Sequence, residues 1–289
     1  MQKSNPKKII RKPQHQQRPG KESAMQPLPV FDYPDQRGSS KLANKVAVIT
    51  GGDSGIGKAV AVLFAKEGAD IAIIYLNEHG DAKETSEIIT NQYNRNCLLI
   101  PADISKETAC RKAIARVIKE YGRIDVLVNN AAIHFESESL EAISGPQLLK
   151  TFSTNVFSMF WITSAALANM RDGSSIINTT SVTAYRGSSS LIDYSATKAA
   201  IVGFTRSLAQ SLIEKGIRVN AVAPGPIWTP LIVSSFQPKK VAKHGSDAPM
   251  KRAGEPVEVA PSYLFLACND SSYITGQVLH PNGGEIVNG

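Results

Sequence analysis

The chain has few cysteines and no long apolar run. These two absences argue against a disulfide-rich, a zinc-binding or a membrane-spanning protein. Its three cysteines, Cys97, Cys110 and Cys268, are odd in number and far apart in 289 residues, which predicts neither a disulfide framework nor a zinc-ligand spacing. No apolar stretch approaches the roughly 20 residues that span a membrane. The N-terminus lacks the apolar core of a secretory signal, because Ile9-Ile10 is too short. We therefore expect a reducing compartment, the cytoplasm, and no metal site.

Basic charge is scarce outside the first 41 residues. The chain has a formal net charge of +7, but residues 1–41 hold nine Lys and Arg against three Asp and Glu. The other 248 residues therefore carry a net charge of only +1. A body so close to neutral has no overall basic excess for nucleic acid. We expect no specific nucleic-acid partner and no membrane partner.

The first 40 residues differ in composition from the rest of the chain. They are rich in Lys, Gln, Pro and Gly, and they are expected to form an N-terminal arm that is partly disordered, over its first twenty residues. Within the arm, residues 24–36 mix Pro with large apolar side chains such as Phe31 and Tyr33, which predicts an extended strap on a surface. Residues 41–289 show no linker-like shift and are expected to form a single domain.

Short apolar runs alternate with helical stretches from Lys45 onward. The strand-like runs lie at 46–49, 71–75, 97–100, 124–128, 175–178 and 219–223, with a last candidate near Val278. The helical stretches lie at 58–67, 105–121, 147–170, 197–215 and 256–267. This alternation predicts an α/β fold: a doubly wound, mainly parallel, Rossmann-like sheet with helices on both faces, plus the extended arm. The long polar stretch 231–255 breaks the pattern and predicts a mobile flap over a site.

A glycine-rich turn joins the first strand to the first helix. Residues 50–57 read Thr-Gly-Gly-Asp-Ser-Gly-Ile-Gly, and we call them the glycine turn. Gly51 permits a tight turn, Gly55 lets backbone approach phosphate oxygens, and Gly57 allows close packing of helix on strand. Backbone N–H groups and the helix dipole then favour a pyrophosphate. The turn therefore predicts a dinucleotide site.

The same residues also fit the start of a nucleoside-triphosphate loop. Gly52 to Lys58 reads Gly-x-x-x-x-Gly-Lys, but the next residue is Ala59. That motif needs Ser or Thr there, because the hydroxyl binds Mg²⁺. The dinucleotide interpretation is therefore favoured over ATP or GTP hydrolysis.

The residues after the second strand leave the choice between NAD and NADP open. An acidic residue there would bind the adenosine ribose and repel a 2′-phosphate, whereas a basic residue would attract it. Here the strand ends in Tyr75-Leu76-Asn77, with Glu78 just beyond. The sequence excludes neither cofactor.

Four residues downstream can move a proton. Tyr194 and Lys198 are four apart, which puts both on one face of a helix. A free tyrosine has a pKa of roughly 10, and a nearby ammonium lowers it, so Tyr194 can act as general acid or base. Ser181 lies at the end of a strand, where its hydroxyl can bind the substrate oxygen. Asn155 lies in a helix and can hold a water for a proton relay.

Together these residues resemble the short-chain dehydrogenase/reductase family, and more narrowly its bacterial general-stress oxidoreductase and aldehyde-reductase branch. The resemblance covers residues 41–289, which it identifies as a single dinucleotide-binding catalytic domain. It implies a catalytic tetrad of Asn155, Ser181, Tyr194 and Lys198, and a homotetramer. Ala132 stands where the family usually has Gly. The implied cofactor-binding residues are Gly51, Asp53, Ser54, Gly55, Ile56, Gly57, Tyr75, Asn77, Asp103, Ile104, Asn130, Ala131, Ala132, Tyr194, Lys198, Pro224, Gly225, Ile227 and Thr229.

The predicted function is reversible hydride transfer between NAD or NADP and a small carbonyl or alcohol: an aldehyde, a ketone or a polyol. Residues expected to face the substrate are Ser181, Tyr194, His134 and Trp228. Two alternatives stay open at this point. One is a cofactor-sensing regulatory protein on the same fold, and the other is a ketoacyl-type reductase, which would need a basic surface for an acidic carrier.

Overall fold

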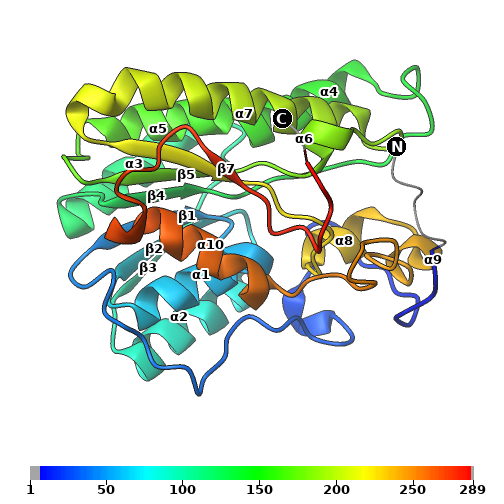
Figure 1. The fold of residues 1–289 in the computed structure, drawn as a ribbon, viewed down its shortest axis with the longest axis horizontal. Coiled ribbons are helices and arrows are strands. Elements are labelled where there is room, and N and C mark those ends of the chain that lie inside the picture. Colours follow the sequence, from blue (N-terminus) through cyan, green and yellow to red (C-terminus); the bar gives the residue numbers. More distant parts are fainter. Residues whose placement is uncertain (1–6, 288–289) are drawn as a thin grey trace.

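The structure is a computed structural model that describes residues 7–287. Seven parallel strands form one sheet in the order β3-β2-β1-β4-β5-β6-β7 (Figure 1). The central strands consist of buried apolar residues, as expected for strands covered on both faces. Their bounds are β1 Val46–Thr50, β2 Asp70–Tyr75, β3 Cys97–Pro101, β4 Val126–Asn129, β5 Ser175–Thr179, β6 Arg218–Val222 and β7 Val278–Leu279.

Helices cover both faces of the sheet, so the predicted doubly wound fold is confirmed (Figure 1). Helices α1 (Gly55–Lys66), α2 (His79–Tyr93) and α10 (Pro256–Ala267) bury one apolar cluster against it. Helices α3 (Glu107–Tyr121), α5 (Ser158–Leu167) and α7 (Ile192–Leu212) bury another on the opposite face. Within residues 7–287, no helix combines the length and the apolar character needed to cross a membrane.

Two helical regions differ from the sequence expectation. Helix α2 was not predicted, because its buried positions are only Asp81, Ala82, Thr85 and Ile89, and small or polar members hide the helical spacing. The predicted helix 147–170 is real but interrupted. It consists of α4 (Gly145–Phe152), a π-helical turn at Ser153–Phe157, and α5.

The stretch 231–255, predicted as a mobile flap over a site, is helical only in part. It contains α8 (Pro230–Ser235) and α9 (Pro238–Val241). A further short helix, α6 (Thr183–Arg186), lies earlier in the chain, before α7. Val233 and Val241 are fully buried in a separate small cluster that also contains Met25 of the arm. Its apolar residues pack in a cluster shared with the arm rather than on the sheet. Residues of this stretch from Leu231 to Asp247 also line the cavity at the carboxyl ends of the strands, as a flap over a site would.

The arm runs over this stretch as extended backbone. The Ile10 amide donates to Ala242 O at 2.8 Å, and the Gln16 amide donates to Val233 O at 2.9 Å. The disorder expected of the first twenty residues falls in part on residues 1–6, which lie outside the described residues. The strap expected at residues 24–36 is in place, since Phe31 packs on the core cluster beside α1.

Candidate active site

A cavity of about 1040 Å³ opens at the carboxyl ends of the strands. It lies where the strand order reverses between β1 and β4, which is the usual ligand site of an open α/β sheet. Its walls come from the glycine turn, the segment after β4, the segment after β5, the start of α7, and residues 224–236. Arg18, Pro19 and Gly20 of the arm complete the wall.

The glycine turn has the conformation that its glycines permit. Gly51 and Gly55 are left-handed, with φ of 64° and 54°, a region that L side chains rarely adopt. A Cβ on Gly57 would lie 1.8 Å from Gly51 O, so only glycine allows α1 to pack this closely. The Asn130 side chain fixes the turn from β4, since its Nδ2 donates to Thr50 O and Gly51 O at 3.1 and 3.3 Å.

The donors at the start of α1 suit an anion. The first N–H groups of a helix have no partner within the helix and carry its positive dipole end. Among the described residues, no acceptor is bonded to the amides of Ile56 or Gly57. Both lie at the turn that lines the cavity through Gly55 and Ile56. The residues present therefore fit a dinucleotide pyrophosphate.

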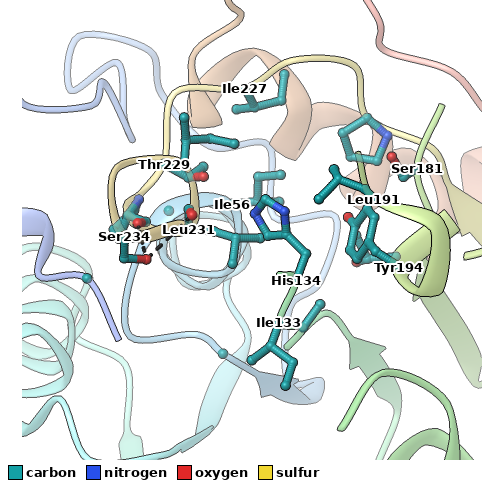
Figure 2. Close-up of a pocket in the computed structure, with 18 of the residues that line it drawn as sticks. Ile56, Ile133, His134, Ser181, Leu191, Tyr194, Ile227, Thr229, Leu231 and Ser234 are labelled. Atoms are coloured by element: carbon teal, nitrogen blue, oxygen red, sulfur yellow. Dashed lines mark hydrogen bonds between the residues drawn. The ribbon is translucent and has the colours of Figure 1, made fainter. Parts of the chain in front are cut away.

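Tyr194, Lys198 and Ser181 line the same cavity, and Figure 2 shows Tyr194 and Ser181 on one side of it. Helix α7 carries Tyr194 and Lys198, and the Lys198 Nζ lies 5.4 Å from the centre of the Tyr194 ring. The same Nζ donates to Thr179 O at 2.7 Å, while Lys198 O accepts from Thr180 Oγ1 at 2.6 Å. These two bonds fix α7 to the end of β5, where Ser181 follows.

Burial dominates the proton affinities of this pair. It raises the pKa of Tyr194 to about 12, against a smaller opposing effect of the Ser181 hydroxyl. It lowers the pKa of Lys198 to about 7, because Lys198 is only 1% exposed and no charged neighbour among residues 7–287 offsets the loss of solvent. The expected lowering of the Tyr194 pKa by Lys198 is therefore not found in the protein alone.

Asn155 lies behind the cavity wall and touches protein on every side. Its Oδ1 accepts from the Ile133 amide at 2.8 Å, and its Nδ2 donates to Ile133 O at 2.8 Å. The same Nδ2 donates to Thr197 Oγ1 at 3.2 Å, between Tyr194 and Lys198 in sequence. The side chain therefore links the segment after β4 to α7. A π-helical turn, a distortion common at functional sites, delivers it there.

His134 lies in the middle of the cavity, beside Tyr194 (Figure 2). Its ring centre is 5.2 Å from that of Tyr194 and 4.9 Å from that of Phe236. Neither ring nitrogen has a hydrogen-bond partner among the described residues, although the side chain is buried. Burial, with a contribution from Arg18, lowers the pKa of His134 to about 3, so the imidazole is neutral at pH 7.

Trp228 is placed elsewhere than predicted. It is fully buried, does not line the cavity, and donates from Nε1 to Pro27 O of the arm at 2.9 Å. The Arg11 guanidinium lies 4.4 Å above its ring. The prediction that Trp228 faces the substrate is therefore wrong, because this tryptophan anchors the arm.

Most of the other predicted site residues line the cavity. Gly57 and Asn77 do not: Gly57 serves packing, and Asn77 lies in an exposed turn. Ala132 does line it, and its backbone is not left-handed, so the exchange of Gly for Ala causes no strain there. The predicted residues that line the cavity are Gly51, Asp53, Ser54, Gly55, Ile56, Tyr75, Asp103, Ile104, Asn130, Ala131, Ala132, His134, Ser181, Tyr194, Lys198, Pro224, Gly225, Ile227 and Thr229.

Residues of the arm supply a part of the cavity wall that the sequence does not predict. Arg18 lies 4.3 Å from the centre of the Phe135 ring, and a Cβ on Gly20 would lie 2.6 Å from Pro230 O. No local pattern marks these residues, since they reach the cavity only through long-range packing of the arm on α8.

Comparisons with known proteins identify the family. Residues 51–285 match the family model described as enoyl-(acyl carrier protein) reductase. The chain is 56% identical over 281 residues to NADPH-dependent aldehyde reductase 1, chloroplastic, of Arabidopsis thaliana (95% of this chain, 97% of that protein). It is 52% identical over 282 residues to general stress protein 39 of Bacillus subtilis (98% of each). It is 50% identical over 283 residues to glucose and ribitol dehydrogenase of Daucus carota (96% and 97%).

The chain belongs to the short-chain dehydrogenase/reductase family. Solved structures agree with this. A short-chain dehydrogenase of Burkholderia cenocepacia in complex with NADP superimposes with a TM-score of 0.79 at 32% identity, over 84% of this chain and 98% of that one. A 3-ketoacyl-(acyl-carrier-protein) reductase of Brucella melitensis complexed with NADH gives 0.75 at 31%, with the same coverage. The chain is thus an oxidoreductase of a family that uses NAD or NADP.

Proposed function

We propose that the protein reversibly transfers hydride between NAD or NADP and a small polar carbonyl or alcohol, with Tyr194 as the general acid and base. The observation that carries this proposal is the meeting of Tyr194, Lys198 and Ser181 in one cavity with the glycine turn. When bound, the nicotinamide supplies or accepts the hydride. The protein then has to bind the substrate oxygen and move one proton.

Tyr194 and Ser181 would both donate to the carbonyl oxygen, and Tyr194 would give its proton as the alcohol forms. Each charged form of the Tyr194–Lys198 pair favours the other, since a phenolate raises the pKa of an adjacent amine and an ammonium lowers that of a phenol. Lys198 would thus become fully charged as Tyr194 ionises. Asn155 acts on this pair as a positioning residue through Thr197.

The cofactor would lie along the cavity from the glycine turn to Tyr194. The amides of Ile56 and Gly57 would hold the pyrophosphate, and Lys198 the ribose. Asp53, Tyr75 and Asp103 line the end where the adenosine would lie. The other predicted cofactor residues that line the cavity are proposed in the same role, and Asn77 in a supporting turn.

The substrate end of the cavity suits a hydroxylated molecule. A neutral His134 offers one donor and one acceptor, which match a second substrate hydroxyl. Leaving both nitrogens of a buried imidazole without partners is costly, so a polar ligand is favoured there over an apolar one. Two relatives are named for aldehyde reduction and for glucose and ribitol oxidation. We therefore propose small hydroxyaldehydes, ketones or polyols as the substrate class.

Replacing the phenol tests this proposal. Tyr194→Phe should lower kcat by about 10²–10⁴-fold, the contribution of general acid–base catalysis, while NADPH still binds. The measurements are turnover with a panel of aldehydes, ketones, polyols and an acyl-carrier thioester, and cofactor affinity by fluorescence. Unchanged turnover would remove Tyr194 from the mechanism. Binding without turnover of any panel member by the unaltered protein would favour a cofactor sensor.

We also propose a cytoplasmic homotetramer in which residues 41–289 form the catalytic domain. Large apolar side chains are exposed on α4 and α5, and exposed apolar side chains that gather on one face mark interaction surfaces. Leu149 is 64% exposed and Phe160 is 50% exposed. Burial of this face between copies would account for them, and light scattering measures the assembly.

A further inference from the structure

The lysine that made the glycine turn look like a triphosphate loop does not face the cavity. Lys58 is 2% exposed and is absent from the cavity wall. Its Nζ lies 2.9 Å from Glu22 Oε1 and 2.7 Å from Glu84 Oε1, and it lies 4.2 Å from the centre of the Phe31 ring. Two of these three partners, Glu22 and Phe31, belong to the arm.

Glu22 also contacts the glycine turn itself. Its Oε2 accepts from the Gly55 amide at 2.6 Å, which is the first N–H of α1 and has no partner within the helix. Its own amide donates to Asp81 Oδ2 at 2.8 Å, at the start of α2. One buried arm residue is therefore bonded to the turn, to the following helix α1, and to α2.

The carboxylate reaches the turn from behind. Gly55 lines the cavity, whereas Glu22 does not, and Glu22 is only 4% exposed. It therefore leaves the amides of Ile56 and Gly57 for an anion on the cavity side. Its carboxylate is paired with Lys58, which also pairs with Glu84. Gly55 has a left-handed φ of 54°, and a bond to its amide holds that conformation in place.

We propose that Glu22 is a positioning residue for the dinucleotide, through which the arm holds the glycine turn in its binding conformation. This inference rests on the proposed cofactor site and adds a dependence of cofactor affinity on the arm. It also gives a reason for the one acidic residue among the first 31 residues of an otherwise basic arm.

The chain offers a matched control on the same helix. Asp32 of the arm is paired with Lys66 of α1 and accepts from Tyr93 Oη at 2.6 Å. The Asp32 and Lys66 side chains are 10% and 6% exposed, close to the values for Glu22 and Lys58. Both pairs anchor the arm to α1, but only Glu22 touches the glycine turn.

The test compares Glu22→Ala, Glu22→Gln and Asp32→Asn in the full chain. NADPH affinity is measured by fluorescence titration, and folding by thermal unfolding. We expect the Kd for NADPH to rise about tenfold in Glu22→Ala and less in Glu22→Gln, whose amide oxygen can still accept from Gly55. In Asp32→Asn the Kd should stay within twofold while the melting temperature falls.

Three results would overturn the proposal. An unchanged or lower Kd in Glu22→Ala would mean that Glu22 is neutral toward the cofactor or competes with it. An equal rise in Asp32→Asn would mean that general docking of the arm, and not the turn contact, is responsible. If Glu22→Ala does not fold, an unchanged Kd in Glu22→Gln together with an altered one in Asp32→Asn decides against it. Loss of turnover in Tyr194→Phe with normal NADPH binding tests the proposed chemistry separately.

Discussion

Two lysines are buried to the same extent, one behind the glycine turn and one in the cavity, and their surroundings are opposite. Lys58 is 2% exposed and Lys198 is 1% exposed. Burial alone would lower the pKa of Lys58, but the charges and hydrogen bonds of Glu22 and Glu84 raise it above its ordinary value. Lys198 has the Thr179 carbonyl and the Tyr194 ring beside it, it forms no ion pair within the part of the chain that the structure describes, and burial lowers its pKa to about 7.

The difference in surroundings distinguishes a lysine that stabilises the structure from a lysine that can take part in the reaction. A buried charge whose hydrogen-bonding partners are all protein groups fixes the positions of those groups and has no bond left to offer a ligand. A buried amine without a carboxylate can change its charge near neutral pH, and perturbed groups of this kind gather at functional sites. Lys58 thus belongs to the scaffold of the turn, and Lys198 to the proton-handling set.

The largest effect should follow removal of the cavity lysine. In Lys198→Met the phenolate of Tyr194 loses the charge that favours it, so we expect kcat to fall by about 10³-fold. Steady-state turnover at saturating NADPH measures this. Lys58→Met is the control and should keep kcat within a few fold at temperatures where it is folded. Activity of Lys198→Met within tenfold of the unaltered protein would contradict the comparison.

Much of this site could be predicted because its signals are local. The spacing of Tyr194 and Lys198 places both on one face of a single helix, and the glycines at 51, 55 and 57 each have a steric reason that holds within one turn. Strands β1 to β6 were predicted for the same reason, since each is a short apolar run of its own.

The features that could not be predicted depend on contacts between distant parts of the chain. Trp228 looked like a cavity residue from its neighbours in sequence, but Pro27 and Arg11 of the arm hold it in the core. The π-helical turn around Asn155 has no sequence signal. It is seen only in the structure, where Asn155 is bonded to Ile133, a residue far from it in the sequence. The role of Glu22 appears only once the arm is seen against α1.

The second effect should be on stability, behind the turn. Lys58→Met leaves the Glu22 carboxylate buried without its main partner, and breaking a buried pair in this way costs about 3–5 kcal/mol. Chemical unfolding measures the loss. The double variant Glu22→Gln/Lys58→Met leaves neither member of the buried pair charged and should recover most of it. If the double variant is as unstable as the sum of the single ones, the two residues are not coupled.

The sharpest comparison lies in the pH dependence of stability, where the effect of a one-unit change in pH is the smallest of the three. Between pH 7 and 10.5 the unfolded chain holds the Lys198 proton and the folded chain does not, so unfolding binds a proton and the free energy of unfolding rises with pH. The slope is at most about 1.4 kcal/mol per pH unit. Lys198→Met lacks this contribution, and its stability relative to the unaltered protein should therefore decline from pH 7 to 10.

Lys58 has a raised pKa, so its contribution is fully present below pH 10.5 and is lost only above it. The stability difference between Lys58→Met and the unaltered protein should accordingly be flat over the same range. The free energy of unfolding of each variant is measured with denaturant at matched ionic strength across this pH range. Equal slopes against pH for the two variants would show that the partners of the two lysines do not set their charge.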